Sequence, residues 1–223
     1  YKAYKEGLLM HSTIDYTCSS TQISGMSKNA FESYLFKDGK PMALTSLNKS
    51  DEAPFQYGHL SLKDILAVRD KRLAQTIDTV LLYNGRGFTR FNTGMESTSS
   101  TGYGVAKYDN EAIPEGFRSQ SGKNYTHAPL FWLSVIYLNY AEACAELGNI
   151  TQDDLDKSIN LLKDRAGLPH LNPIVGFSDP ANSHGVSDLI WEIRRERRCE
   201  LMFDNDNRYW DLIRWHQLDK LDT

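Results

Sequence analysis

The side chains whose types and spacing carry the most chemistry lie near the C-terminal end, in the charged segment RRERRCE. Arginine and glutamate are mixed in this segment, so it is not a uniformly basic patch. The apolar stripe around it stops at Ile193 and resumes at Leu201. At helical spacing the interval is filled by Arg197, or by Glu196 and Glu200. At least one charge should therefore face inward, where only a hydrogen-bonded ion pair is tolerated.

A second charged segment offers the partners. Arg208, Asp211 and Arg214 are spaced three residues apart, so they share one face of a helix. We predict that ion pairs between the two segments lock two consecutive helices together. The alternative is a solvated face of surface pairs, each worth about 0 to 1 kcal/mol.

The chain carries no recognisable catalytic or metal-binding motif. The GxSxG, HExxH and phosphate-loop patterns are absent, and the Gly85 to Gly87 segment lacks the third glycine of a dinucleotide fingerprint. The histidines show no metal-ligand spacing, and the three distant cysteines indicate free thiols. Asp204 begins a calcium-loop-like stretch, but Tyr209 occupies the position of the required glycine, so helix capping is the preferred interpretation. We expect no cofactor and no metal, although the many carboxylates leave a glycosidase pair open.

Aromatic side chains in a glycine-rich loop are the best candidates for ligand binding. A ring can stack on the apolar face of a sugar, while arginine and amide groups satisfy the hydroxyls. The alternative is that these rings pack the loop onto the core. Tyr209, Trp210 and Trp215 are expected to be packing residues. The candidate ligand-binding residues are Tyr83, Arg86, Phe88, Arg90 and Phe91.

The composition excludes several classes of protein. The 223 residues are 40% hydrophobic and 24% charged, which is typical of a globular protein. The net charge of -4 argues against nucleic acid as the main partner, because phosphate binding needs a basic surface. Since the chain shows neither a long apolar run nor a signal peptide, we expect no membrane span in it. An export signal is expected to have been removed or to lie outside this chain.

The chain changes character near Ala128. Residues 1–128 are expected to form a loop-rich region with a short helix and a hairpin, and residues 129–223 a helical region, together one structural domain. The dipeptide Asp38-Gly39 predicts a tight hairpin. The segment LKDILAVRDKRLAQ predicts one helix, and the apolar run after it predicts a strand.

Four helices are predicted in the second region by apolar residues that recur every three or four positions. The inward stripe of the first helix includes Leu133 and Leu147, with Glu142 on the outer face. The second helix begins at a capping box on Thr151 and places Asn160 on its outer face. A helical hairpin follows from the short link between them. The four predicted helices span residues 130–147, 151–166, 187–203 and 207–218.

These helices carry a family resemblance. ERRCELMF from Glu196 and RYWDLIRW from Arg208 resemble the C-terminal signature of SusD/RagB proteins, ERRRELAFE followed by RYFDLRRW. YLNYAEA from Tyr137, INLLKDRAGLP from Ile159 and shorter stretches further upstream match family patterns in the same order. The resemblance spans residues 34–215, and six motifs in a fixed order make it specific. The signature residues are Glu196, Arg197, Glu200, Arg208, Trp210, Asp211 and Arg214.

The chain also departs from the family pattern. Trp132 and Val135 stand where the family usually has an arginine and a glutamate, so both members of an ion pair are missing together. The link from Asp204 to Asn207 differs from the usual EGH. Family members are longer chains that begin with a lipidated cysteine, so we expect this chain to be a fragment of a longer one.

The resemblance implies a mostly α-helical fold of tetratricopeptide-like helix pairs, with a loop-rich excursion that contains short strands. It implies a surface-exposed outer-membrane lipoprotein, attached only through a lipid anchor outside this chain. Such proteins bind glycans or peptides, deliver them to a SusC-like TonB-dependent transporter, and are not enzymes. A helical-repeat interaction module and a carbohydrate-active enzyme are the alternatives.

Overall fold

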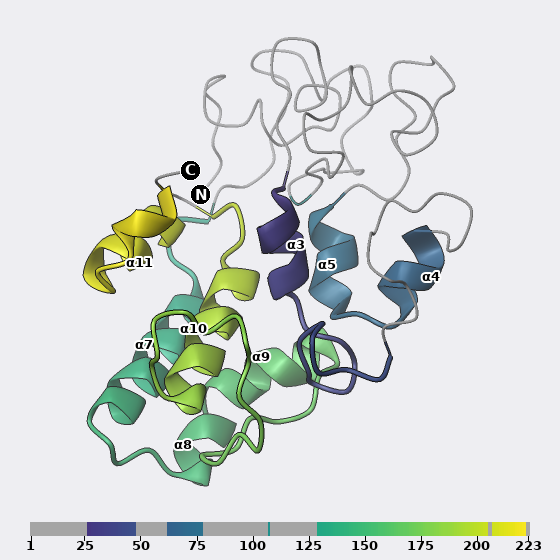
Figure 1. Cartoon of the computed structure of the whole chain (residues 1–223). Helices are drawn as coiled ribbons and strands as arrows, with labels where there is room; N and C mark the ends of the chain where they lie inside the picture. The colour runs from purple at the N-terminus through teal and green to yellow at the C-terminus, as the bar shows by residue number, and fades with distance from the viewer. Residues whose placement is uncertain (1–25, 48–61, 78–106, 108–128, 205–206, 222–223) are drawn as a thin grey trace. The chain divides into compact units, whose positions relative to one another are not determined.

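The computed structural model describes residues 26–47, 62–77, 107, 129–204 and 207–221 (Figure 1). The chain divides into two compact units, Tyr1–Trp132 and Leu133–Thr223, and each is described by itself. The described residues are mostly helical, and the one pairing between extended segments that they contain is an isolated bridge between Phe36 and Arg69. The expected mostly α-helical fold class is confirmed.

In the first unit the predicted single helix LKDILAVRDKRLAQ is wrong, because the segment forms two helices. Arg69 between them forms an isolated antiparallel bridge with Phe36. Asp70 then caps the second helix, since its side chain accepts a hydrogen bond from the backbone N–H of Arg72 at 2.8 Å. The helices of this unit are α3 (Lys28–Ser33), α4 (Leu62–Ala67) and α5 (Lys71–Thr76).

Arg69 closes the C-terminal end of α3. Its side chain is 1% exposed, and Nη2 donates to the backbone carbonyls of Phe31 and Tyr34 at 3.0 and 2.8 Å. Its guanidinium also lies over the ring of Phe36, 4.3 Å from the centroid. A buried cation thus adds hydrogen bonds to the carbonyls at the end of this helix, where the Phe31 carbonyl also accepts a 3.4 Å bond from the N–H of Tyr34.

The turn predicted at Asp38-Gly39 is present, but the predicted hairpin is wrong for the described residues, because Phe36 forms its isolated bridge with Arg69 and not with a residue after the turn. Gly39 has a φ of +76°, and the N–H of Phe36 donates to the carbonyl of Lys40 at 3.0 Å. The Asp38 carboxylate accepts a hydrogen bond from Thr45 Oγ1 at 2.8 Å, which ties the following residues back to the turn. The remainder of the predicted loop-rich excursion and its strand lie outside the described residues, apart from Ile77 and Lys107.

The second unit is a helical bundle in which α10 packs against α7 and α9 (Figure 1). Its core is made of aliphatic side chains from all four central helices and the segments after α9 and α10. These are Leu138, Ala141, Leu155, Ile159, Leu162, Leu171, Ile193 and Leu201. The elements are α7 (Leu133–Glu146), α8 (Gln152–Asp156), α9 (Ile159–Ala166), α10 (Asp188–Glu200), α11 (Asn207–Arg214) and the 3₁₀ helix η3 (Leu218–Leu221).

The link between α7 and α8 has the predicted chemistry. Gly148 takes a left-handed conformation with a φ of +71° after the end of α7. Thr151 and Asp154 form the capping box, each side chain accepting from the other residue's backbone N–H. Hydrogen bonds from Thr151 and then Tyr140 lower the pKa of Asp154 to about 2, so the carboxylate that caps α8 also anchors α7.

The predicted helix 151–166 is two helices, and the exposed position predicted for Asn160 is wrong. Helix α8 ends at Asp156, and Ser158 has a non-helical φ of −133° and ψ of −98° before α9 begins. Asn160 is fully buried because its amide holds the backbone of Leu171: Oδ1 accepts from the N–H at 2.7 Å, and Nδ2 donates to the carbonyl at 3.0 Å. The Asn160 amide thus forms both hydrogen bonds that a neighbouring strand would otherwise form with the backbone of Leu171.

The inward face of α7 also differs from the prediction. Leu133 and Leu147 are 63% and 76% exposed, whereas Leu138 and Ala141 are fully buried. The buried face includes Glu142, which is 5% exposed although its charge predicted an outer position. A polar partner inside the unit acts together with the buried Leu138 and Ala141 to orient this helix.

Candidate functional site

The predicted ligand-binding residues Tyr83, Arg86, Phe88, Arg90 and Phe91 lie outside the described residues. The signature residues of the second unit are described. Five of them belong to a set of polar, charged and aromatic side chains from α7, α9, α10, α11 and the residue after α11, which we call the signature network. These five are Glu196, Arg197, Glu200, Asp211 and Arg214. The network consists of Asn139, Glu142, Lys163, Arg165, Arg194, Glu196, Arg197, Glu200, Asp211, Arg214 and Trp215.

Helix α10 supplies charges from its buried face. The helix begins at Ser187, whose Oγ accepts from the N–H of Ile190 at 3.3 Å. Glu196 and Arg197 are 2% and 6% exposed, on the same buried side as Ile193. The predicted inward charge is therefore present on two adjacent residues.

Arg197 forms the predicted ion pair with helix α11. Its Nε lies 2.8 and 2.7 Å from the two carboxylate oxygens of Asp211, and both side chains are at most 8% exposed. Its Nη1 donates to Asn139 Oδ1 at 2.8 Å, so the same guanidinium also reaches α7. One buried cation thus joins three helices.

Glu142 of α7 is the second centre of the network, and the sequence prediction missed it. Arg214 binds it through two hydrogen bonds, Nη1 to Oε1 at 2.8 Å and Nη2 to Oε2 at 2.6 Å. Trp215 Nε1 donates to Oε1 at 2.6 Å. The signal that points to Glu142 is its place in the YLNYAEA motif, since its spacing alone places it on the outer face.

Arg214 connects Glu142 with the Arg197–Asp211 pair. Its Nε donates to Asp211 Oδ1 at 2.8 Å while its two terminal nitrogens hold Glu142. Burial alone would lower the pKa of Arg214, but the hydrogen bonds that Arg214 donates to Glu142 and Asp211 outweigh burial and raise its pKa. The guanidinium therefore stays charged and paired.

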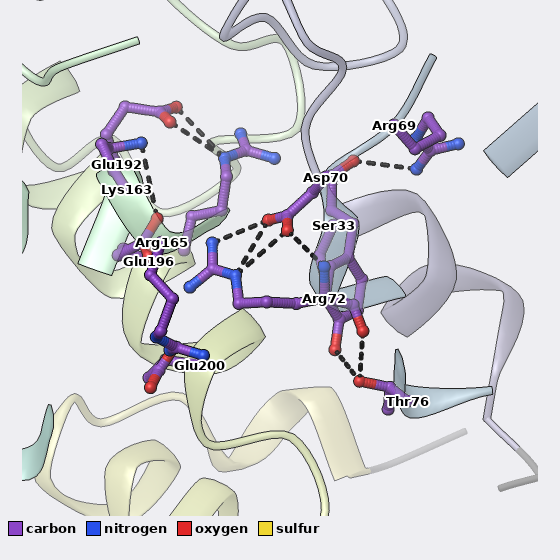
Figure 2. A network of polar contacts seen from close by, with 12 residues as sticks. Ser33, Arg69, Asp70, Arg72, Thr76, Lys163, Arg165, Glu192, Glu196 and Glu200 are labelled. Atoms are coloured by element: carbon purple, nitrogen blue, oxygen red, sulfur yellow. Dashed lines mark hydrogen bonds and ion pairs between the residues drawn. The ribbon is translucent and has the colours of Figure 1, made fainter. Parts of the chain in front are cut away.

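Glu196 and Glu200 pair with α9 rather than with α11. Lys163 Nζ lies 3.4 Å from Glu196 Oε2, and the two side chains are 3% and 2% exposed (Figure 2). Arg165 forms an ion pair with Glu200 beside them. The prediction that the α10 charges find their partners on α11 holds for Arg197, whereas these two glutamates bind the opposite neighbour.

The aromatic residues of α11, together with Trp215 directly after it, divide into two groups. Trp215 is 9% exposed and packs as predicted, with the guanidinium groups of Arg194 and Arg214 at 4.7 and 4.6 Å from its ring centroid. The packing role predicted for Tyr209 and Trp210 is wrong, since they are 49% and 62% exposed. Asp211 and Leu212 occupy the inward face of this helix, so the two residues before them point outward.

The charged groups of the signature network pair with one another, so few of them are available as catalytic acids or bases. Its buried carboxylates each lie against at least one cation, so none is an isolated acid or base. Within the described ranges, no group of three histidine, cysteine, aspartate or glutamate residues could hold a metal ion. The geometry fits a structural junction between helices.

We predict that Arg197→Ala and Asp211→Ala each lower the free energy of unfolding by about 3 to 5 kcal/mol, because each leaves a buried charge without its partner. Chemical denaturation of both variants measures this. Lys157→Ala is the control, since Lys157 pairs with Asp153 at the surface, where both side chains are more than two-thirds exposed. Unfolding midpoints equal to that of the control would contradict a buried junction.

Comparisons with known proteins agree with this architecture. A model of the SusD family matches residues 14–222. Two solved structures of BT4246, a Bacteroides protein, have the same fold with 23% sequence identity. The selenomethionine form has a TM-score of 0.61 and aligns with 90% of this chain and 36% of its own. The other form has a TM-score of 0.60, with 88% and 34% covered.

The chain thus spans about a third of the length of the solved structures that it matches. No curated protein sequence matches it significantly. The family match covers nearly the whole chain, including the signature segments on α10 and α11 and the motif on α7 that supplies Glu142. The chain belongs to the SusD family.

Proposed function

We propose that this chain is part of a protein that captures nutrient oligomers, glycans or peptides, at the cell surface. The observation that carries the proposal is the family match over residues 14–222, because the SusD family is a family of nutrient-binding proteins. The signature network supports it indirectly. A rigid helical junction is a suitable scaffold for loops that contact a ligand.

The ligand contacts are proposed to come from the loop that holds Tyr83, Phe88 and Phe91, with Arg86 and Arg90 between them. Rings offer flat apolar surfaces for sugars or for peptide side chains, and the arginines can donate to hydroxyls or carbonyls. The signature network is a poorer candidate, since its donors and acceptors already bind one another. We therefore propose a binding protein and not an enzyme.

The proposed destination of the ligand is a SusC-like TonB-dependent transporter in the outer membrane, with this protein held at the cell surface by a lipid anchor. Family membership supports both parts of this proposal. None of the helices in the described ranges has the length and apolar character needed to cross a membrane.

A helical-repeat interaction module is the second candidate function. The short helix pair of α7 and α8, closed by the capping box at Thr151, is the observation that favours it. Such a module would bind a protein partner and no small oligomer. The ligand experiment therefore separates the two.

We expect the full-length protein to bind members of a glycan or peptide array. A variant with Tyr83, Phe88 and Phe91 all changed to alanine should bind at least tenfold more weakly, because the stacking surfaces are removed. Trp210→Ala is the matched control, as it removes an exposed ring from α11 and should leave affinity unchanged. Equal binding by the triple variant would rule out this loop, and hydrolysis of a bound oligosaccharide would favour an enzyme.

The transporter proposal has its own test. When the full-length protein is affinity-purified from detergent-solubilised outer membranes, a SusC-like β-barrel transporter should copurify in a near-equal amount. The same purification after removal of the lipid-attachment cysteine should give far less transporter, because the protein no longer concentrates at the membrane. Purification of the anchored protein without any transporter would contradict the proposed partnership.

A further inference from the structure

Helix α7 is apolar on two opposite sides. Its buried side carries Leu138 and Ala141, which belong to the core of the helical unit. Its two charged residues, Glu142 and Glu146, both pair with arginines of the same unit. The opposite side of the helix is also apolar, and it is exposed. We call it the α7 stripe, and it consists of Leu133, Ile136, Tyr140 and Ala143 of the helix and Leu147 directly after it.

The large side chains of the α7 stripe are well exposed. Leu133 and Ile136 are 63% and 61% exposed, and Leu147 is 76% exposed. Tyr140 is 47% exposed, and its ring is held in place because its hydroxyl donates a hydrogen bond to Asp154 Oδ1 of the α8 cap. A single exposed apolar residue is common at a protein surface, whereas a row of them along one helix face marks a contact surface.

The spacing within the stripe indicates the kind of partner. Successive members are three, four, three and four residues apart, which is the seven-residue repeat of contacts between helices. A second helix that lies along α7 at a shallow angle can insert its side chains between these positions. A lipid surface is a poorer match, because α7 carries no lysine or arginine. The partner is therefore expected to be an α-helix whose own apolar residues recur every three or four positions.

The small area of the stripe indicates where that helix comes from. Helix α7 has 14 residues, so the stripe is about 21 Å long and about 10 Å wide, an area on the order of 200 Å². A stable complex between separate proteins buries about 800 Å² on each partner. The stripe alone is thus too small to hold a second copy or a free protein. A helix of the same polypeptide needs a far smaller contact, because the chain keeps it at a high effective concentration near the stripe.

Proteins with this fold are long enough to provide such a helix. The chain aligns with 36% and 34% of the two BT4246 chains, so about two-thirds of each of those chains has no counterpart in it. A longer polypeptide of this kind can supply an additional helix to α7 without a separate partner.

We propose that the α7 stripe docks an amphipathic helix of the longer polypeptide to which this chain belongs, from outside residues 1–223. This inference rests on the part of the proposed function that makes the chain a portion of a longer protein. It places α7 between two layers, with α9 and α10 on one side and the docked helix on the other. A helix that is apolar on both sides is typical of such an interior position.

Photo-crosslinking of the full-length protein tests the identity of the occupant. Ile136 is replaced by photo-reactive benzoylphenylalanine, and the cross-linked peptides are identified by mass spectrometry after irradiation. We expect a cross-link within the same polypeptide to a segment outside residues 1–223 that carries apolar residues every three or four positions. Lys157, whose side chain is 71% exposed, is replaced in the same way as the control and should not reach that segment. Cross-links confined to a second copy, to another protein or to residues 1–223, or no cross-link at all, would overturn the proposal.

Thermal unfolding of full-length variants tests whether the stripe is covered. Ile136→Lys should lower the unfolding midpoint by several degrees, because it places a charge without a partner in an apolar contact. Ile174→Lys is the matched control, since Ile174 is 86% exposed in the loop after α9, and it should leave the midpoint unchanged. If Ile136→Lys does not fold, Ile136→Ala and Ile174→Ala give the same comparison with a smaller expected decrease.

Equal midpoints for the variants at the two positions would overturn the proposal. Neither measurement involves a ligand, so failure of the docked helix and failure of the proposed oligomer binding give different results.

Discussion

Two carboxylates inside the helical unit, Glu142 on α7 and Asp211 on α11, set the constraint on which the rest of that unit depends. A buried carboxylate is tolerated only when cations and hydrogen bonds replace the water that it has lost. Arg214 donates hydrogen bonds to both carboxylates. Arg197 binds Asp211 and also donates a hydrogen bond to Asn139 of α7. The angle of α11 against α7 and α10 is therefore fixed by hydrogen-bond geometry as well as by apolar packing. A change of one partner affects three helices at once.

This arrangement separates the part of the chain that identifies the family from the part proposed to bind ligand. Most charged residues of the signature segments on α10 and α11 are paired within the protein, which gives a physical reason for their fixed spacing. The paired residues are Glu196, Arg197, Glu200, Asp211 and Arg214. The proposed ligand contacts belong to a loop of different composition.

The sequence predicted the ends and the caps of the helices better than their faces. Ser187, Gly148 and the Thr151 capping box act locally through the backbone, so their residue types are sufficient to place them. The Arg197–Asp211 pair was predictable because Arg197 stands on the apolar face of α10, between Ile193 and Leu201. Glu142 and Asn160 were assigned to outer faces because their burial depends on partners distant in sequence, Arg214 and the backbone of Leu171. The break at Arg69 has the same cause, since its guanidinium is bound by carbonyls of α3 that no local pattern reveals.

The central claim is that the signature network fastens α11 to the helical unit. Hydrogen–deuterium exchange of a Glu142→Gln variant tests this most directly, because it reports on each helix separately. The variant removes one charge of the network and leaves Arg214 and Trp215 with a neutral acceptor. We predict that amides of α11 exchange more than tenfold faster, which corresponds to a loss of about 1.4 kcal/mol in local stability, while α9 keeps its protection. Unchanged protection of α11 in this variant would contradict the account.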